Sequence, residues 1–199
     1  MKKPSLQQLF VEFIGTFLLA FGVGVSIAEH GFAIPTILVA GVILGTVVYT
    51  IGPISGAHIN PAVTISLYSI GKITIRQAIL YVIVQLLGGY CAMLLLSALI
   101  GSTGLVPVDS FKSAIGEIIG TFVLVWGVCS VVLGKVEAAA SGLTIGSSLS
   151  IGIIIALSGS FGVLNPAVAL GIGTISVVYI LAPIVGGIIA AQVYRWVLK

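Results

Sequence analysis

The chain has 199 residues, of which 59% are hydrophobic and 7% charged, and its mean hydropathy is +1.30. Soluble domains carry a charge on about a quarter of their residues, so this composition excludes a soluble globular protein. The net charge of +3 does not indicate a nucleic-acid partner, because the basic residues lie at the ends of apolar segments.

The apolar segments predict a membrane protein with several spans. A helix needs ~20 apolar residues to cross a bilayer. In chain order we expect six such helices, at about residues 6–27, 34–51, 75–99, 111–133, 142–157 and 177–198. Two helices too short to cross are expected at 61–70 and 166–172, each after an irregular stretch, at 52–59 and 158–164. A tight turn is expected at Glu29-His30-Gly31.

The first helix has some features of a signal peptide, with Lys2-Lys3, an apolar run and Ser26-Ile27-Ala28. However, Glu12 lies inside the run, and the segment has an internal counterpart at 117–130 that could not be cleaved off. We therefore expect the helix to be retained.

One motif occurs twice, as Asn60-Pro61-Ala62-Val63 and as Asn165-Pro166-Ala167-Val168. Asn can cap a helix and Pro suits the first helical position, so one copy alone would indicate only an ordinary helix start. The copies lie 105 residues apart, and the same offset relates Glu12–Phe17 to Glu117–Phe122, Gly22 to Gly127, and Gly41 to Gly146. Later the offset falls to 98, which relates Tyr81 and Gly88-Gly89 to Tyr179 and Gly186-Gly187. Residues 1–199 are therefore predicted to form one transmembrane domain of two repeats, at approximately 6–99 and 111–198.

Three spans per repeat is an odd number, so the second repeat enters the membrane from the opposite side and the repeats are inverted. Irregular backbone at membrane depth is tolerated only where it lines a cavity or is buried in protein. We therefore expect the two short helices to enter from opposite faces and to meet end to end.

The basic residues predict the orientation. One of them, Lys112, lies on the side away from the termini. The side of the termini holds Lys2, Lys3, Lys72, Arg76, Lys135, Arg195 and Lys199. By the positive-inside rule both termini are cytoplasmic.

Three pairs of glycines four residues apart allow helices to approach closely: Gly41/Gly45, Gly116/Gly120 and Gly142/Gly146. We favour tight packing inside one bundle over a dimer motif.

Cys91 and Cys129 lie inside apolar spans and are interpreted as core residues, because their spacing indicates neither a disulfide nor a metal site. The sequence also lacks a nucleophile–base set, a phosphate-binding loop and metal-ligand spacing. We therefore expect no enzyme activity, no metal and no cofactor.

The chain resembles the major intrinsic proteins, which are the aquaporins and glycerol facilitators, over nearly its whole length. The resemblance rests on Ser55-Gly56-Ala57-His58-Ile59-Asn60-Pro61-Ala62-Val63, Leu164-Asn165-Pro166-Ala167, Glu12, Glu117, Tyr81-Val82-Ile83-Val84-Gln85 with Gly88, and Pro183 with Gly186. It implies an all-α membrane protein with six transmembrane helices and two re-entrant half-helices in two inverted repeats. It also implies a homotetramer in the cell membrane.

The two short helices provide hydrogen-bond donors at mid-membrane. Their N-termini offer unpaired N–H groups and about half a positive charge each, and Asn60 and Asn165 add side-chain amides. The resemblance implies that backbone carbonyls complete a lane for solutes, here those of Gly56, Ala57, His58, Phe161, Gly162 and Val163. Neutral solutes would exchange hydrogen bonds along it, whereas cations would meet two positive dipole ends.

Glu12 and Glu117 are carboxylates inside the membrane, where charged groups usually have a function. A proton relay is one interpretation. The resemblance favours another, in which each carboxylate supports a re-entrant loop by accepting backbone N–H bonds. His58 is a candidate pH sensor, although we favour a structural histidine that contributes its carbonyl.

In this family four positions outside the plane of the two motifs form a selectivity filter, typically with an aromatic residue, a His or small residue, a small residue and an Arg. Here these positions hold Ala40, Ile153, Gly162 and Val168. Ala169 also stands where glycerol facilitators often have Asp. We therefore expect a wide, apolar filter, and strict selectivity for water is not implied.

The first functional hypothesis is a passive channel for water and small neutral solutes such as glycerol, urea, hydrogen peroxide or dissolved gases. One alternative is an alternating-access secondary transporter, which also uses inverted repeats and broken helices. Another is a structural membrane protein with a closed pore.

Overall fold

The computed structural model describes residues 3–28 and 34–199, so the turn expected at 29–31 lies outside the described residues. Over these residues the secondary structure is helical: α1 (Leu6–Ala28), α2 (Thr36–Ser55), α3 (Pro61–Ser69), α4 (Ile75–Leu99), α5 (Phe111–Val132), the 3₁₀ turn η1 (Ala138–Ala140), α6 (Ser141–Ala156), α7 (Pro166–Gly171) and α8 (Val177–Val197). Within the described part, 6 helices are long and apolar enough to cross a membrane. The predicted spans and the two half-helices, α3 and α7, are thereby confirmed.

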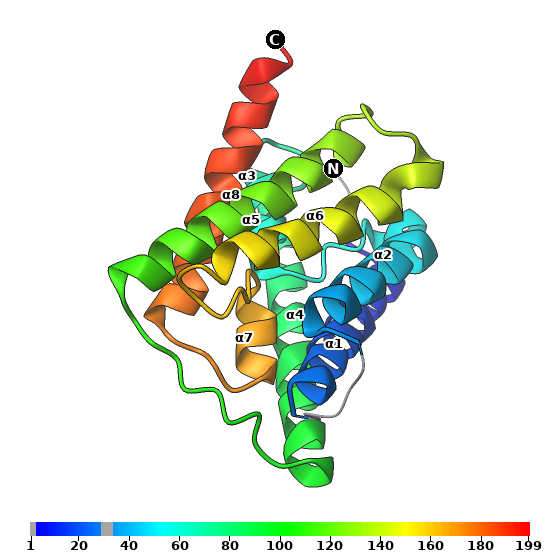
Figure 1. Cartoon of the computed structure of the whole chain (residues 1–199). Coiled ribbons are helices and arrows are strands. Elements are labelled where there is room, and N and C mark those ends of the chain that lie inside the picture. The colour runs from blue at the N-terminus through cyan, green and yellow to red at the C-terminus, as the bar shows by residue number, and fades with distance from the viewer. Residues whose placement is uncertain (1–2, 29–33) are drawn as a thin grey trace.

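The two repeats pack in the same way and interlock (Figure 1). In the first repeat α1 packs against α2 and α4, and in the second α5 packs against α6 and α8. Contact between α2 and α6 joins the repeats. Each half-helix reaches into the other repeat, because α3 packs against α8 and α7 against α4. The half-helices also contact each other, as expected for re-entrant segments that meet inside the bundle.

Short polar side chains fix the starts of three long helices. The hydroxyl groups of Thr74, Ser110 and Ser176 accept a backbone N–H from the first turns of α4, α5 and α8. Each cap satisfies a donor that would otherwise have no partner at the helix end.

Helix α2 ends at Ser55 and not near Ile51, so the prediction of irregular backbone from residue 52 is wrong for residues 52–55. Pro53 lies inside the helix and cannot donate a hydrogen bond to the preceding turn. It is exposed at the end of the helix, where water can satisfy the freed carbonyl. The helix stops at Gly56, whose left-handed φ of 96° directs its N–H to the carbonyl of Gly52.

The paired glycines lie at helix contacts inside the bundle, as predicted. A Cβ atom on Gly45 of α2 would lie 2.8 Å from the carbonyl oxygen of Gly142 in α6. Likewise, a Cβ atom on Gly120 of α5 would lie 2.7 Å from the carbonyl oxygen of Gly152 in α6. These distances are too short for a side chain, so α6 packs backbone to backbone on both neighbours.

The two cysteines differ in their surroundings. Cys129 is buried in the core, as predicted, whereas Cys91 is only half-buried, so its interpretation as a core residue is wrong. Both thiols are free.

Candidate functional site

A cavity of about 850 Å³ lies between the two repeats. Residues at both ends of α2 line it, as do residues at both ends of α6. Because α2 has 20 residues, the cavity extends over about 30 Å, which is the thickness of the hydrocarbon core of a bilayer. None of the described residues that line it is an Asp, Glu, Lys or Arg. The cavity is thus an elongated passage, and the described part of its wall carries no Asp, Glu, Lys or Arg side chain.

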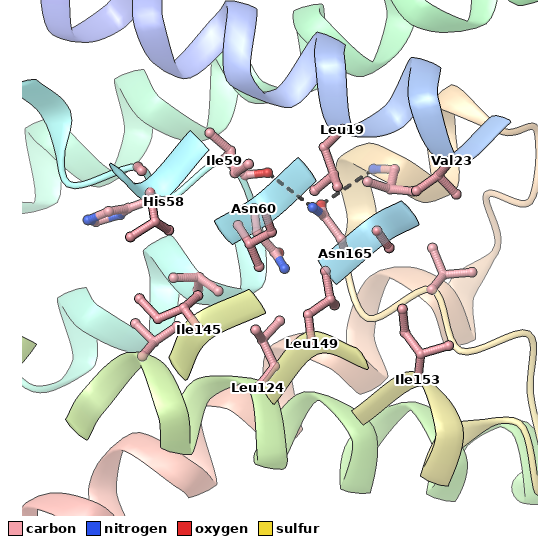
Figure 2. Close-up of a pocket in the computed structure, with 18 of the residues that line it drawn as sticks. Leu19, Val23, His58, Ile59, Asn60, Leu124, Ile145, Leu149, Ile153 and Asn165 are labelled. Carbon is pink, nitrogen blue, oxygen red and sulfur yellow. Dashed lines mark hydrogen bonds between the residues drawn. The ribbon is translucent and has the colours of Figure 1, made fainter. Parts of the chain in front are cut away.

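The asparagines of the two repeated motifs lie next to each other in the middle of this cavity (Figure 2). The side-chain oxygen of Asn60 accepts the N–H of Ala62 at 2.8 Å, and that of Asn165 accepts the N–H of Ala167 at 3.0 Å. Both residues therefore cap their half-helices, and a proline occupies the first turn of each. Figure 2 shows His58 on one side of the pair and Ile153 towards the other end.

Each asparagine is also bonded to the loop of the other repeat. The Nδ2 atom of Asn60 donates to the carbonyl of Leu164 at 2.9 Å, and that of Asn165 to the carbonyl of Ile59 at 3.0 Å. A carboxamide carries two N–H groups. One is used in this reciprocal link, and for the other no partner among the described residues is found.

Glu12 supports the first re-entrant loop, which precedes α3. Its Oε1 atom accepts the backbone N–H of His58 at 2.9 Å and the hydroxyl of Ser55 at 2.6 Å. Its Oε2 atom accepts the N–H of Ile59 at 2.7 Å and the amide of Gln85 at 2.9 Å. A carboxylate has about four acceptor sites, so all of them are occupied.

Glu117 supports the second re-entrant loop in the same way but with one donor fewer. It accepts from Ser160 Oγ at 2.8 Å, Val163 N at 2.9 Å and Leu164 N at 2.7 Å. The offset of 98 residues places Pro183 where the first repeat has Gln85, so no side-chain amide is available.

The two loops share an unusual backbone. Ala57 and Ile59 have left-handed φ angles of 49° and 38°, and their counterparts Gly162 and Leu164 have 65° and 56°. Such angles cost about 1–3 kcal/mol each for residues other than glycine. The bonds from the loops to Glu12 and Glu117 offset this strain. The six residues expected to form the carbonyl lane all line the cavity: Gly56, Ala57, His58, Phe161, Gly162 and Val163.

The four expected filter residues also line the cavity: Ala40, Ile153, Gly162 and Val168. Ile153 and Gly162 are close neighbours, since a Cβ atom on Gly162 would lie 3.0 Å from the carbonyl oxygen of Ile153. These four residues can therefore present only alkyl groups and backbone atoms to the cavity.

The family model for major intrinsic proteins matches residues 1–194. The chain belongs to the major intrinsic protein family. It is 35% identical to nodulin-26 of Glycine max, with 96% of this chain and 78% of that protein covered. It is 34% identical to the glycerol uptake facilitator protein-like 6 of Lactiplantibacillus plantarum, with 94% and 95% covered. Among solved structures, it is similar in fold to the aquaglyceroporin from Plasmodium falciparum, with a TM-score of 0.82, 24% identity, and 97% and 96% of the chains covered.

Major intrinsic proteins are channels and not enzymes. This member is accordingly a multi-pass membrane channel with the expected inverted-repeat fold. The proton-relay interpretation of its buried glutamates loses support, because their oxygens are bonded to the loops.

One wall of the cavity in this major intrinsic protein is apolar, and it was not predicted from the sequence. Figure 2 shows Leu124, Leu149 and Ile145 facing the two asparagines across the cavity. The repeat itself could have revealed this wall, because many lining residues are pairs 105 positions apart: Leu19 with Leu124, Val23 with Val128, Leu44 with Leu149, Val48 with Ile153, and Val63 with Val168.

Proposed function

We propose that the protein is a passive channel for water and small neutral solutes, with glycerol, urea, hydrogen peroxide and dissolved gases as candidates. The observation that carries the proposal is the cavity that follows α2 and α6 from end to end, with Asn60 and Asn165 at its centre and no charged side chain among its described lining residues. A neutral solute can cross such a passage because amide and carbonyl groups replace the hydrogen bonds that it makes with water. It needs no bound ion to do so.

The filter supports a solute range wider than water. Where the family typically has an aromatic residue and an arginine, this chain has Ala40 and Val168. Both substitutions shorten the side chain, and the second removes five N–H donors. A solute at this level is held by backbone groups and by contacts with alkyl side chains.

The exclusion of cations rests on the half-helices. The N-termini of α3 and α7 lie at the two asparagines, and a helix N-terminus carries about half a positive charge. A cation in the cavity would meet both ends and would have no carboxylate in contact with it. We propose the same barrier for protons.

We place the channel in the cell membrane with both termini in the cytoplasm, because Lys3, Lys72, Arg76, Lys135, Arg195 and Lys199 lie at that end and only Lys112 at the other among the described residues. We also propose a homotetramer of identical single-domain subunits, by likeness to the family.

An alternating-access transporter is disfavoured because the carboxylates of Glu12 and Glu117 are used to anchor the two loops, and neither residue lines the cavity. Stopped-flow light scattering on proteoliposomes, first with water and then with solutes of increasing size, tests the channel. We expect permeability above that of protein-free liposomes for water and for glycerol. Saturable, ion-coupled uptake would favour the transporter instead, and rates equal to those of bare lipid would indicate a closed pore.

A further inference from the structure

We infer that Gln85 and Thr64 hold His58 in the tautomer with the proton on Nε2, and that this Nε2–H is a fixed hydrogen-bond donor to solutes in the pore. The second half of this statement rests on the proposed function. The first half does not.

The imidazole of His58 has two different surroundings at its two nitrogens. The Nδ1 atom lies 3.2 Å from the hydroxyl oxygen of Thr64, in the first turn of α3. The imidazole and the ring of Tyr81 form a T-shaped pair, with the ring centroids 5.2 Å apart. No hydrogen bond from Nε2 to the described residues is found. Among these residues Thr121 Oγ1 is the one side-chain polar atom that is fully enclosed and has no partner. Because Nε2 also has no partner but is not such an atom, it is not fully enclosed. Since His58 lines the cavity and its Nε2 atom is not fully enclosed, we place this nitrogen at the cavity.

The orientation of the Gln85 amide follows from Glu12. The carboxylate accepts two backbone N–H bonds, from His58 and Ile59, and it can only accept from Gln85 as well. The atom of Gln85 that lies 2.9 Å from Glu12 Oε2 is therefore Nε2. The second hydrogen of this amide points to Thr64 Oγ1, also at 2.9 Å.

The hydroxyl of Thr64 then has one hydrogen left to donate. Two acceptors are near: Nδ1 of His58 at 3.2 Å and Oε1 of Gln85 at 3.3 Å. Since Thr64 already accepts from the same Gln85 amide, a bond back to Oε1 would close a small ring in which both hydrogen bonds are bent, and bent hydrogen bonds are weaker. The hydrogen goes to Nδ1, which must be unprotonated. The proton of the neutral ring is then on Nε2, because the bond at one nitrogen sets the state of the other.

This chain of bonds exists in one repeat only. At the corresponding positions the second repeat has Pro183 for Gln85, Ala169 for Thr64 and Val163 for His58. The half of the pore next to α3 therefore carries a side-chain donor that the half next to α7 lacks. A solute that has left the asparagines on the α3 side finds a further side-chain N–H, whereas at the matching position on the α7 side it meets the alkyl group of Val163 beside the loop carbonyls.

The first test is the ¹⁵N NMR spectrum of protein labelled at histidine, because the shifts of imidazole nitrogens differ between N–H and bare nitrogen. The chain has two histidines, and a His30→Gln variant assigns the signals of His58. We expect a bare Nδ1 and a protonated Nε2 in the wild type. Thr64→Val, which keeps the side-chain shape, should give a mixture of tautomers. Ser66→Ala is the matched control, since it removes a buried hydroxyl of α3 that bonds to Ala62 and not to His58.

The second test is permeability to water and to glycerol in proteoliposomes. His58→Phe retains the backbone carbonyl and a ring against Tyr81 but removes the donor, and we expect permeability to fall by about three- to tenfold, the equivalent of one hydrogen bond. Thr64→Val should lower it by a smaller factor, and Ser66→Ala should leave it unchanged.

A wild-type spectrum with Nδ1 protonated, or an unchanged spectrum in Thr64→Val, would overturn the role of Gln85 and Thr64. Equal flux in wild type and in folded His58→Phe would overturn the role of Nε2–H. The NMR result requires no flux, so wild-type vesicles no more permeable than lipid would overturn the proposed function while the tautomer is still decided.

Discussion

Gly41 of α2 lies against the backbone of Gly146 in α6, so that a Cβ atom on Gly41 would be 2.9 Å from the carbonyl oxygen of Gly146. The two helices belong to different repeats, and both line the cavity. The width of the passage therefore depends on this contact as well as on the side chains that face the passage.

We expect Gly41→Ala to destabilise the protein by about 1–3 kcal/mol, because the added methyl group must push α2 and α6 apart. Thermal unfolding in detergent measures the effect. Gly52→Ala is a suitable control in the same helix, since its Cβ atom would have Val48 as its nearest neighbour, at 4.0 Å. That change should be neutral or stabilising by about 0.5–1 kcal/mol, as usual for glycine within a helix. Equal melting temperatures for the two variants would show that the glycine contact is not tight.

Replacing Asn60 should affect both folding and flux. Asn60→Ala loses the cap of α3, worth ~1 kcal/mol, and the bond to the carbonyl of Leu164, worth another ~1 kcal/mol. Thr74→Ala removes a cap of the same kind from α4, outside the cavity. We expect both variants to melt earlier but only Asn60→Ala to lose water permeability. If Asn60→Ala folds and conducts like the wild type, Asn60 has neither role.

The two glutamates should differ in their tolerance of glutamine. In Glu12→Gln the new NH₂ group faces two donors whichever way the amide turns, because each oxygen accepts two bonds. In Glu117→Gln the amide can turn so that only Leu164 N–H loses its acceptor. Each unsatisfied group costs about 1–3 kcal/mol, so Glu12→Gln should lower the melting temperature more. Unchanged stability together with loss of a pH-dependent flux would restore the proton relay.

Val168→Arg tests the filter. The new side chain should narrow the passage beside Ala40 and Ile153 and restore a positive charge, so glycerol flux should fall by more than water flux. Any proton leak should fall as well. The ratio of the two permeabilities in proteoliposomes, measured after the variant has been shown to melt cooperatively, is the readout. A wild type that already excludes glycerol, or a ratio that stays constant, would refute the wide filter.

Asp109 gives the protein a predicted acid sensitivity outside the membrane. Its carboxylate accepts the hydroxyl of Ser176 at 2.5 Å and the N–H of Val178 at 3.1 Å. These bonds hold the pKa of Asp109 below its ordinary value of 3.8, and the hydrogen bond from Ser176 has the largest effect. A lowered folded-state pKa means that the stabilisation is complete above the unfolded pKa and is lost as the pH falls through the folded one.

We therefore expect the melting temperature of the wild type to decrease below about pH 4, as the link from Asp109 to the start of α8 weakens. Asp109→Asn should melt earlier at neutral pH, and its difference from the wild type should shrink on acidification. A difference that stays constant from pH 7 to pH 3 would exclude this role of the carboxylate.

The positions of α3 and α7 could be predicted from the sequence because Asn60-Pro61 and Asn165-Pro166 are local signals for a helix start, and the structure has both helices there. The end of α2 could not be predicted from Pro53 alone. Pro53 is tolerated because it is exposed, and exposure depends on the packing of the whole bundle.

The side-chain network around His58 was likewise missed. Gln85 lies 73 residues from Glu12 in sequence, and it is polar within a span where neighbouring residues are apolar. That contrast identifies Gln85 as unusual but does not name its partners. The two reciprocal asparagine bonds were hidden for another reason, since their acceptors are backbone carbonyls of apolar residues, Ile59 and Leu164.

The hydrogen bond from Asn60 to Leu164 cannot form until the second repeat has been synthesised. The two residues are 104 positions apart, and a ribosome adds about 5–20 residues per second. The nascent first repeat therefore spends roughly 5–20 s in the membrane before its acceptor has been made. During that interval the tip of the first loop has only Glu12 and its neighbours to hold it, and α3 lacks α8, the helix it packs against. The first repeat must therefore remain in the membrane without these partners until the second repeat has been inserted.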